Sequence, residues 1–374
     1  MAPSLLVILL CSLSLSTLAQ AAASSTINSH ALDSRANFVH PGLDFFTTKQ
    51  TLPVSNSRST QRQIRGDTVY AKATATTLGA WSSTLTFIDG TSDKFLASGI
   101  YGYQLANAAE ILRGYSGWTG LAAMNTLLEK VFYAMNHDFV VNHNGAKIVH
   151  YWANWDLANL CTKYAIGVLS DNATITNEAV NYFKSTAGNG AIQKTIWAAY
   201  TESGSNKILG QNQEAGRDQG HAMLDYALLG VLAQQTYNQG NDYLATFLIG
   251  SGWTGPEYAA KYNLGFDVPY TTYVNSDVTQ TTISNGSRGN IRPIWELIYG
   301  HYGSLKGLNA SWSKQYRGLV VSNGGGAEGG GGDYGTNSGG YDQLGFDLVP
   351  FCIGWKLEFC AQFTHRVAMS ARNC

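Results

Sequence analysis

Arg217 and His221 are the two side chains whose types and spacing best suit chemistry on an anion. They lie four residues apart at the start of a helical pattern, so we expect both on one helix face. The free N–H groups at a helix start favour a bound carboxylate. The pair therefore predicts a site where Arg217 neutralises a carboxylate, while His221 helps to neutralise it or removes a proton. The alternative is that both side chains make structural hydrogen bonds to the preceding loop.

Asn154 opens a second segment of the same design. The pattern over 154–169 is polar in its first turn and apolar further along one face, as is the pattern over 216–237. Helices packed in a ring, with their N-terminal ends at a common cleft, fit this arrangement. Asn154 is then expected to hydrogen-bond a substrate carboxylate, or otherwise only to cap its helix. Asp156 is interpreted as a first-turn helix acid rather than a catalytic group.

Helical patterns dominate the rest of the chain, and strand patterns are few. The further predicted helices cover 96–113, 121–135, 177–185, 191–201, 242–262 and 294–302. Amphipathic helices joined by Gly- and Asn-rich turns, without alternating strands, predict an all-α fold. No linker separates two cores, so we interpret 22–345 as one domain. It contains a glycine-dense loop at 323–340, and 346–374 is an atypical C-terminal tail.

The composition is compatible with a carbohydrate-handling surface. Charged residues make up 13% of the chain, against about 25% in an average soluble domain. The chain has 21 Tyr and 9 Trp, and aromatic faces can stack on sugar rings. Trp152 and Trp155 are candidate platforms, with core packing as the alternative. The net charge of −1 predicts no nucleic-acid partner, but it allows a local basic cluster to bind a polyanion.

The N-terminus predicts secretion. Residues 5–18 are mostly apolar and are followed by Ala-Gln-Ala at 19–21, which indicates a signal peptide over 1–21. The sequons at Asn172, Asn285 and Asn309 fit an extracellular glycoprotein. We expect no membrane association after cleavage, and a monomer.

Four cysteines remain after removal of the signal peptide. Cys161 lies on an apolar helix face and is expected to be a buried free thiol. The other three are Cys352, Cys360 and Cys374. The pairing of these cysteines stays open. His137, His143 and His150 have no recognised metal-ligand spacing and are interpreted as surface histidines, so we expect no metal and no other cofactor.

Five ordered segments together resemble the alginate lyase superfamily of secreted polysaccharide lyases. They are His-Pro-Gly-Leu at 40–43, Tyr-Trp-Ala-Asn-Trp-Asp-Leu at 151–157, Glu-Ala-Gly-Arg-Asp-Gln-Gly-His at 214–221, Ala-Lys-Tyr-Asn-Leu-Gly at 260–265, and Arg-Pro-Ile-Trp-Glu at 292–296 with Tyr-Gly-His-Tyr at 299–302. The resemblance covers about residues 38 to 305. It is nearest to the branch with alginate- and glucuronan-degrading members. The bacterial alginate lyases carry Asn-Asn-His where this chain has Asn154, Trp155 and Asp156.

The resemblance implies an (α/α) toroid, an incomplete helical barrel of six to seven helical hairpins. It also implies cleavage of a uronic-acid polymer by β-elimination, which yields 4,5-unsaturated oligosaccharides. The reaction requires neutralisation of the uronate carboxylate, a base for the C5 proton and an acid for the O4 leaving oxygen. The expected catalytic residues are His221, Tyr262, Arg217 and Asn154. The expected substrate-binding residues are Gln219, Arg292, His301 and Trp155.

Several alternatives stay open. Gln219 could brace the loop and Arg292 could be a buried structural ion, while Tyr299, Tyr226 and Tyr270 are rivals of Tyr262 for the catalytic phenol. The chain could instead be a glycoside hydrolase that uses two carboxylates, or a glycan-binding protein without activity. The carboxylates available to a hydrolase are Glu214, Asp218, Asp225 and Glu296. Alginate and glucuronan are not separated by the resemblance.

Overall fold

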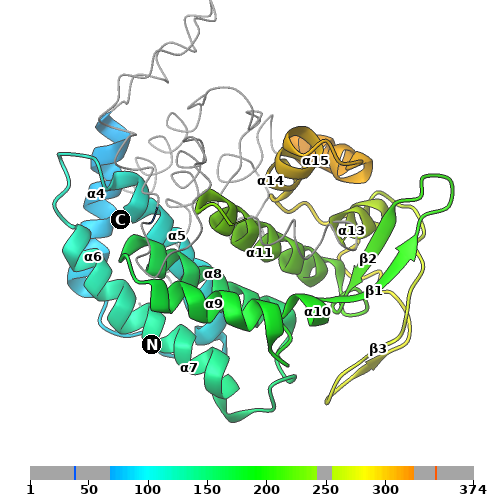
Figure 1. The fold of residues 1–374 in the computed structure, drawn as a ribbon, viewed down its shortest axis with the longest axis horizontal. Helices are drawn as coiled ribbons and strands as arrows, with labels where there is room; N and C mark the ends of the chain where they lie inside the picture. The colour runs from blue at the N-terminus through cyan, green and yellow to red at the C-terminus, as the bar shows by residue number, and fades with distance from the viewer. Residues whose placement is uncertain (1–37, 39–67, 242–254, 324–341, 343–374) are drawn as a thin grey trace, which may run out of the picture.

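The computed structural model describes residue 38, residues 68–241, residues 255–323 and residue 342. The described chain is mostly helical, as predicted, with two short hairpins of strands at one end (Figure 1). The signal peptide, the segment at 40–43, nearly all of the glycine-dense loop and the C-terminal tail lie outside the described residues. Among the described ranges, no helix is long and apolar enough to span a membrane.

The helices mostly lie where the periodicity predicts them. Their bounds are α4 Thr68–Thr84, α5 Asp93–Leu112, α6 Leu121–Leu127, α7 Ala134–Asn142, α8 Ala153–Leu169, α9 Ala173–Ser185, α10 Ile192–Thr195, α11 Gln219–Asn238, α13 Gly255–Asn263, α14 Trp295–Ile298 and α15 Ser311–Asn323. The π-helical segment η2 Leu128–Tyr133 joins α6 to α7, and the π-helical segment η4 Tyr299–Leu305 follows α14. Helices α4 and α15 were not predicted, and neither was α7 beyond Met135. Residues 242–254 of the predicted helix 242–262 lie outside the described residues.

Helix α8 is central to the core. All of its residues are buried, and it packs against α5, α9 and α11 (Figure 1). Helix α5 approaches closely because it has glycine at the contact: a Cβ on Gly99 would lie 2.7 Å from the backbone of Ala158. Thr162 donates a 2.6 Å hydrogen bond to the carbonyl of Gly99 across the same contact. The buried thiol of Cys161 is free, which confirms that prediction.

The predicted helix over 191–201 is wrong beyond Thr195. The segment continues as strand β1, Ile196–Thr201, which pairs antiparallel with β2, Ile208–Asn212. Residues along β1 alternate between exposed and half-buried positions, and its β-branched and aromatic side chains suit a pleated surface. A second hairpin pairs β3, Tyr273–Val274, with β4, Thr279–Gln280.

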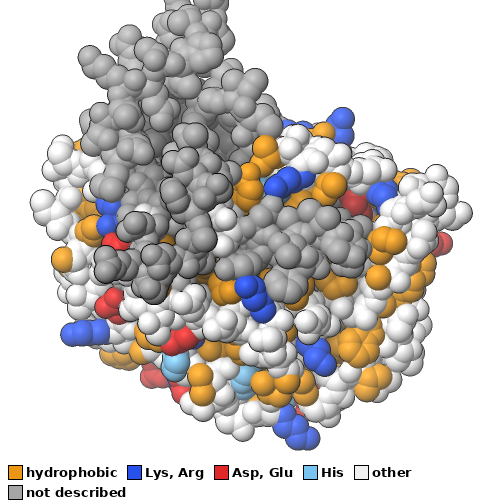
Figure 2. All heavy atoms as spheres, in the orientation of Figure 1, with side chains coloured by type: hydrophobic (Ala, Val, Ile, Leu, Met, Phe, Trp, Pro, Cys, Tyr) orange, Lys and Arg blue, Asp and Glu red, His pale blue; other side chains and the backbone are white. Residues whose placement is uncertain are grey.

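The two hairpins contact each other. The indole Nε1 of Trp197 on β1 donates to the carbonyl of Thr272 at 2.9 Å, and the Tyr200 hydroxyl contacts Thr271 at 2.7 Å. A small apolar cluster of Leu209, Ala215 and Tyr258 packs against Tyr200 of β1, apart from the main core that extends from Ala71 on α4 to Val320 on α15. Charged side chains are scattered over the face in Figure 2 among uncharged ones, as the composition predicts.

Candidate functional site

The segment between β2 and α11 carries the centre of the site. Residues 213–218 turn sharply after β2, with the N–H of Arg217 donating to the carbonyl of Glu214 at 2.9 Å. Helix α11 starts at Gln219, and the Asp218 side chain caps it by accepting from the N–H of His221 at 2.9 Å. Arg217 therefore precedes the helix. The expectation that Arg217 and His221 share a helix face is wrong, because the Asp218 cap begins the helix after Arg217.

Asn154 and Arg217 meet on one carboxylate that the protein itself supplies. The Asn154 Nδ2 donates a short hydrogen bond to Oε1 of Glu214, and Nη1 of Arg217 donates to Oε2 at 2.7 Å. Glu214 is fully buried. Asn154 is not the helix cap, since Trp152 holds that position. The structure thus brings two predicted residues together, but around Glu214.

Beneath Glu214 lies a second acid, Asp225. Burial, and then the neighbouring Glu214 with which it shares a hydrogen bond, raise the pKa of Asp225 well above its ordinary value. The Asp225 Oδ2 also accepts from Nδ2 of Asn212 at 2.8 Å. Since Glu214 already accepts from two donors, we assign the shared proton to Asp225 and the negative charge to Glu214. This charge fixes the Arg217 guanidinium from below.

The side chain of Arg217 is partly accessible. Its side chain is 29% exposed, and its guanidinium carbon lies 5.2 Å from the ring centroid of Trp152. An arginine held by a carboxylate on one edge and an aromatic ring on a face retains further donors for an incoming anion.

His221 pairs with the cap of its own helix. Its Nδ1 lies 2.5 Å from Oδ2 of Asp218, and its side chain is 39% exposed. Burial opposes ionisation of Asp218, but the hydrogen bonds from the side chain and backbone of His221 outweigh burial and lower the Asp218 pKa. A carboxylate at Nδ1 favours the tautomer with the proton on that nitrogen, which leaves the Nε2 lone pair to accept a proton.

Tyr262 is linked to this segment through the loop 284–290. Its hydroxyl donates to Oδ1 of Asn285 at 2.6 Å, and the guanidinium of Arg288 lies 3.8 Å above its ring. The carbonyl of Gly286 in the same loop accepts from the backbone N–H of Gln219 at 2.8 Å. Tyr262 and His221 therefore lie on elements that the same loop joins.

Burial does not separate Tyr262 from the rival tyrosines, because Tyr262 is itself 3% exposed; the rivals differ from it in their partners. Burial raises the pKa of Tyr226 well above its ordinary value, and its hydroxyl donates to the carbonyl of Gly210. Burial also raises the pKa of Tyr270, whose hydroxyl donates to Gln280. The ring of Tyr299 lies against Lys314 and Arg317 of α15.

Gln219 is a bracing residue, which corrects its assignment to substrate. It is 1% exposed. Its amide nitrogen donates to the carbonyls of Ala215 and Ser284, and its amide oxygen accepts from Asn263 at 3.0 Å. With these bonds made, the side chain has no accessible group for a sugar hydroxyl.

The other three predicted substrate residues also belong to the interior. Arg292 is 5% exposed and forms a 2.9 Å ion pair with Asp342. His301 is buried, with Nδ1 3.2 Å from the amide oxygen of Gln234. Trp155 packs with its ring centroid 4.6 Å from that of Tyr151. Their burial corrects the expectation that these side chains face a substrate.

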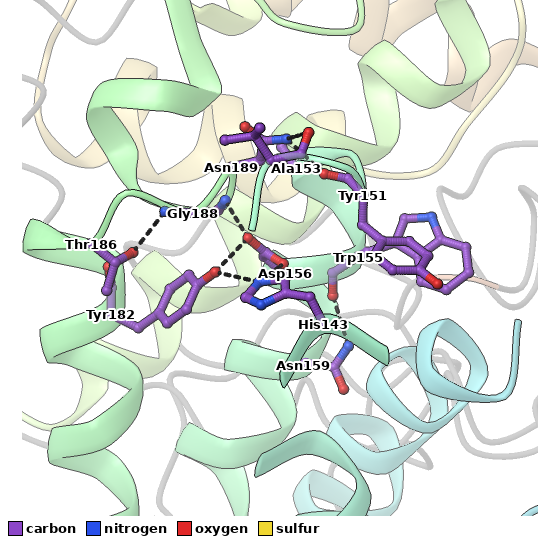
Figure 3. Close-up of polar contacts among 12 residues, drawn as sticks. His143, Tyr151, Ala153, Trp155, Asp156, Asn159, Tyr182, Thr186, Gly188 and Asn189 are labelled. Atoms are coloured by element: carbon purple, nitrogen blue, oxygen red, sulfur yellow. Dashed lines mark hydrogen bonds and ion pairs between the residues drawn. The ribbon is translucent and has the colours of Figure 1, made fainter. Parts of the chain in front are cut away.

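A second buried polar cluster surrounds Asp156 (Figure 3). Its Oδ2 accepts from the Tyr182 hydroxyl at 2.7 Å and from the N–H of Gly190 at 2.8 Å. His143 lies beside them, with Nε2 3.0 Å from the Tyr182 oxygen. The interpretation of His143 as a surface histidine is wrong, since it is 2% exposed. The cluster ties the loop 186–190 to the start of α8.

His137 and His150 are exposed, as predicted, with side-chain exposures of 44% and 46%. Within the described ranges, no three His, Cys, Asp or Glu side chains are grouped so that they could hold a metal ion.

Sequence reasoning missed the roles of Glu214 and Asp225. A signal was present, because Glu214 is three residues before Arg217, and a fully buried acid must find a cation or a proton. The contact between Asp218 and His221 could have been predicted from their spacing. Asp is a preferred N-cap residue, and an N-cap side chain accepts from the backbone N–H three residues later.

Comparison with family models, curated proteins and solved structures finds no match to this chain.

Proposed function

We propose that this protein is a secreted polysaccharide lyase that cleaves a uronic-acid polymer, alginate or glucuronan, by β-elimination. In this proposal the helices form hairpins around a toroid. The observation that carries the proposal is the arrangement around the start of α11. There, the part-exposed Arg217 and the part-exposed His221 both act on Asp218, which lies at Nδ1 of His221. This combination meets the two main demands of uronate elimination, charge neutralisation and proton removal.

The steps follow from these positions. The Arg217 guanidinium binds the carboxylate of the uronate and stabilises the charge that develops as the C5 proton leaves. The Nε2 of His221 takes this proton, and Asp218 stabilises the imidazolium that forms. The electron pair forms the C4–C5 double bond, the C4–O4 bond breaks, and the Tyr262 hydroxyl protonates O4. Asn154 acts through Glu214, which makes it a positioning residue.

A hydrolase is favoured less by the same geometry. Glu214 and Asp225 are the acids at the centre of the site, but both are fully buried and share a hydrogen bond. Retaining glycosidases separate their carboxyl groups by about 5 Å or more, and inverting enzymes by more. Asp218 is engaged with His221, and Glu296 accepts a short hydrogen bond from Arg317.

The proposal is tested by incubating the purified protein with alginate, glucuronan and pectate while following the ultraviolet absorbance of unsaturated products. Replacement of His221 by Ala or of Arg217 by Ala is expected to lower turnover by at least about 100-fold. His150→Ala is the matched control, because His150 is also exposed and pairs with an aspartate, Asp277, at 3.0 Å. New reducing ends without ultraviolet absorbance would identify a hydrolase. Binding of a polyuronate without products would identify a glycan-binding protein.

A further inference from the structure

An aromatic row leads away from the arginine of the candidate site. The guanidinium of Arg217 lies 5.2 Å from the Trp152 ring, the Trp152 ring lies 5.5 Å from that of Tyr273, and the Tyr273 ring lies 4.9 Å from that of Trp197. The row begins before α11 and ends on β1. Its outer end is exposed, since Trp197 has 36% of its surface accessible.

The rings of this row are held in place by hydrogen bonds within the protein. Trp197 donates its indole N–H to the carbonyl of Thr272, and Tyr273 donates its hydroxyl to the amide oxygen of Gln213 at 3.2 Å. Burial, the largest cause, raises the pKa of Tyr273 to about 12, so its hydroxyl stays protonated and keeps donating. The exposed indole is therefore oriented without a ligand.

The exposed face of the Trp197 indole is available to a ligand. Large aromatic rings gain most from burial, and a tryptophan whose N–H already has a partner offers a ligand only its apolar face. The apolar C–H faces of pyranose rings fit such a surface. Ordering the indole in advance removes part of the entropy cost of binding.

We propose that Trp197 forms a distal subsite for an extended acidic polysaccharide. The polysaccharide extends from Arg217 to Trp197, with one uronate carboxylate bound by Arg217 and a more distant sugar ring stacked on Trp197. Tyr273 is 2% exposed, so it supports the ring of Trp197 and makes no contact with the polysaccharide itself. This subsite rests on the proposed function for the identity of the unit at Arg217. Its own claim concerns binding, and binding can be measured without turnover.

The charge of Arg217 indicates which class of polysaccharide binds. The row ends at a guanidinium that retains donors beyond its bond to Glu214, and an arginine recognises a carboxylate with directed hydrogen bonds. A neutral glucan would stack on the exposed ring but offer no carboxylate to the donors that Arg217 keeps beyond its ion pair with Glu214. We therefore assign the subsite to a uronate-containing polysaccharide and expect affinity to increase with the number of sugar units until Trp197 is reached.

The test is affinity electrophoresis of the full chain through gels that contain alginate, glucuronan or a neutral β-glucan. Trp197→Ala is expected to weaken binding to the polyuronate that the protein retains by roughly tenfold, whereas Trp197→Phe keeps most of it. Phe87→Ala is the matched control, because Phe87 is a 70% exposed aromatic residue outside the row. Circular dichroism and the thermal midpoint establish that each variant is folded.

The outcomes separate the two proposals. Equal retention of Trp197→Ala and the parent on every acidic polymer overturns the subsite, and so does a Trp197-dependent retention that is as strong on the neutral glucan. Retention that depends on Trp197 without any unsaturated product supports the subsite and refutes the lyase. Unsaturated products whose formation is equally sensitive to chain length in the parent and in Trp197→Ala support the lyase and refute the subsite.

Discussion

The carboxyl pair beneath Arg217 gives opposite predictions for its two members. Asp225→Asn keeps the geometry, because an amide oxygen can accept from Asn212 and an amide N–H can donate to Glu214. Glu214→Gln removes the negative charge that accepts from Asn154 and Arg217. Two such charge-assisted hydrogen bonds contribute about 3–5 kcal/mol together. We expect Glu214→Gln to lower the free energy of unfolding by that amount, and Asp225→Asn to raise it at neutral pH.

The pH dependence of stability at Asp225 follows from proton binding. Its pKa is raised in the folded state, so the folded protein binds the proton more tightly than the unfolded chain. In the parent protein, stability is therefore lost as the pH rises from the unfolded pKa of about 3.9 towards the folded pKa, by about 1.4 kcal/mol per pH unit. The side-chain amide introduced by Asp225→Asn has no proton to lose. The stability advantage of this variant over the parent should be absent at low pH and grow with this slope.

Urea denaturation of the parent and both variants between about pH 4 and pH 7 measures this difference. A constant difference between Asp225→Asn and the parent across that range would refute the assignment of the proton to Asp225. Equal destabilisation by both substitutions would refute the charged role of Glu214.

Three further changes test other parts of the structure. Burial lowers the pKa of Lys163, which forms a 2.6 Å ion pair with Glu178. Glu178→Gln leaves the Lys163 ammonium without this partner and should lower the free energy of unfolding, measured in urea, by about 3 kcal/mol. The double variant Glu178→Gln/Lys163→Met should lose less, and a double variant that lost more than Glu178→Gln alone would contradict this role of the ion pair. A Cβ on Gly188 would lie 1.9 Å from the Tyr182 hydroxyl, so Gly188→Ala should lower the free energy of unfolding by about 1–3 kcal/mol. The loss should be smaller when Gly188→Ala is made together with Tyr182→Phe, and an equal loss would contradict the clash. Burial raises the pKa of the Cys161 thiol, so alkylation mapped by mass spectrometry should be slow until the chain unfolds, and rapid labelling of the folded protein would contradict its burial.

The sequence predicted the helices whose apolar residues recur with the helical period. Helix α8 has an apolar face with a sustained helical period, so its predicted range 154–169 nearly matches Ala153–Leu169. The segment 191–201 was misread because its apolar residues fit both periods, and the strand depends on pairing with β2, which begins at Ile208. Local periodicity does not contain that tertiary contact.

The site was predicted in part for the same reason. Residue types and the family resemblance selected Asn154 and Arg217, which do come together, but across 60 residues no local pattern shows that Glu214 lies between them. Gln219, Arg292 and His301 were assigned to substrate because their types suit it. Their burial is a property of the packed molecule, and polar side chains in a core find protein partners for the same energetic reason that they would bind a ligand.

The most direct test of the elimination mechanism is proton nuclear magnetic resonance of the products formed from alginate or glucuronan. We expect an olefinic H4 signal from the new non-reducing end with the parent and with His150→Ala, and its loss with His221→Ala. Chain cleavage that yields new reducing ends without this olefinic signal would contradict the mechanism.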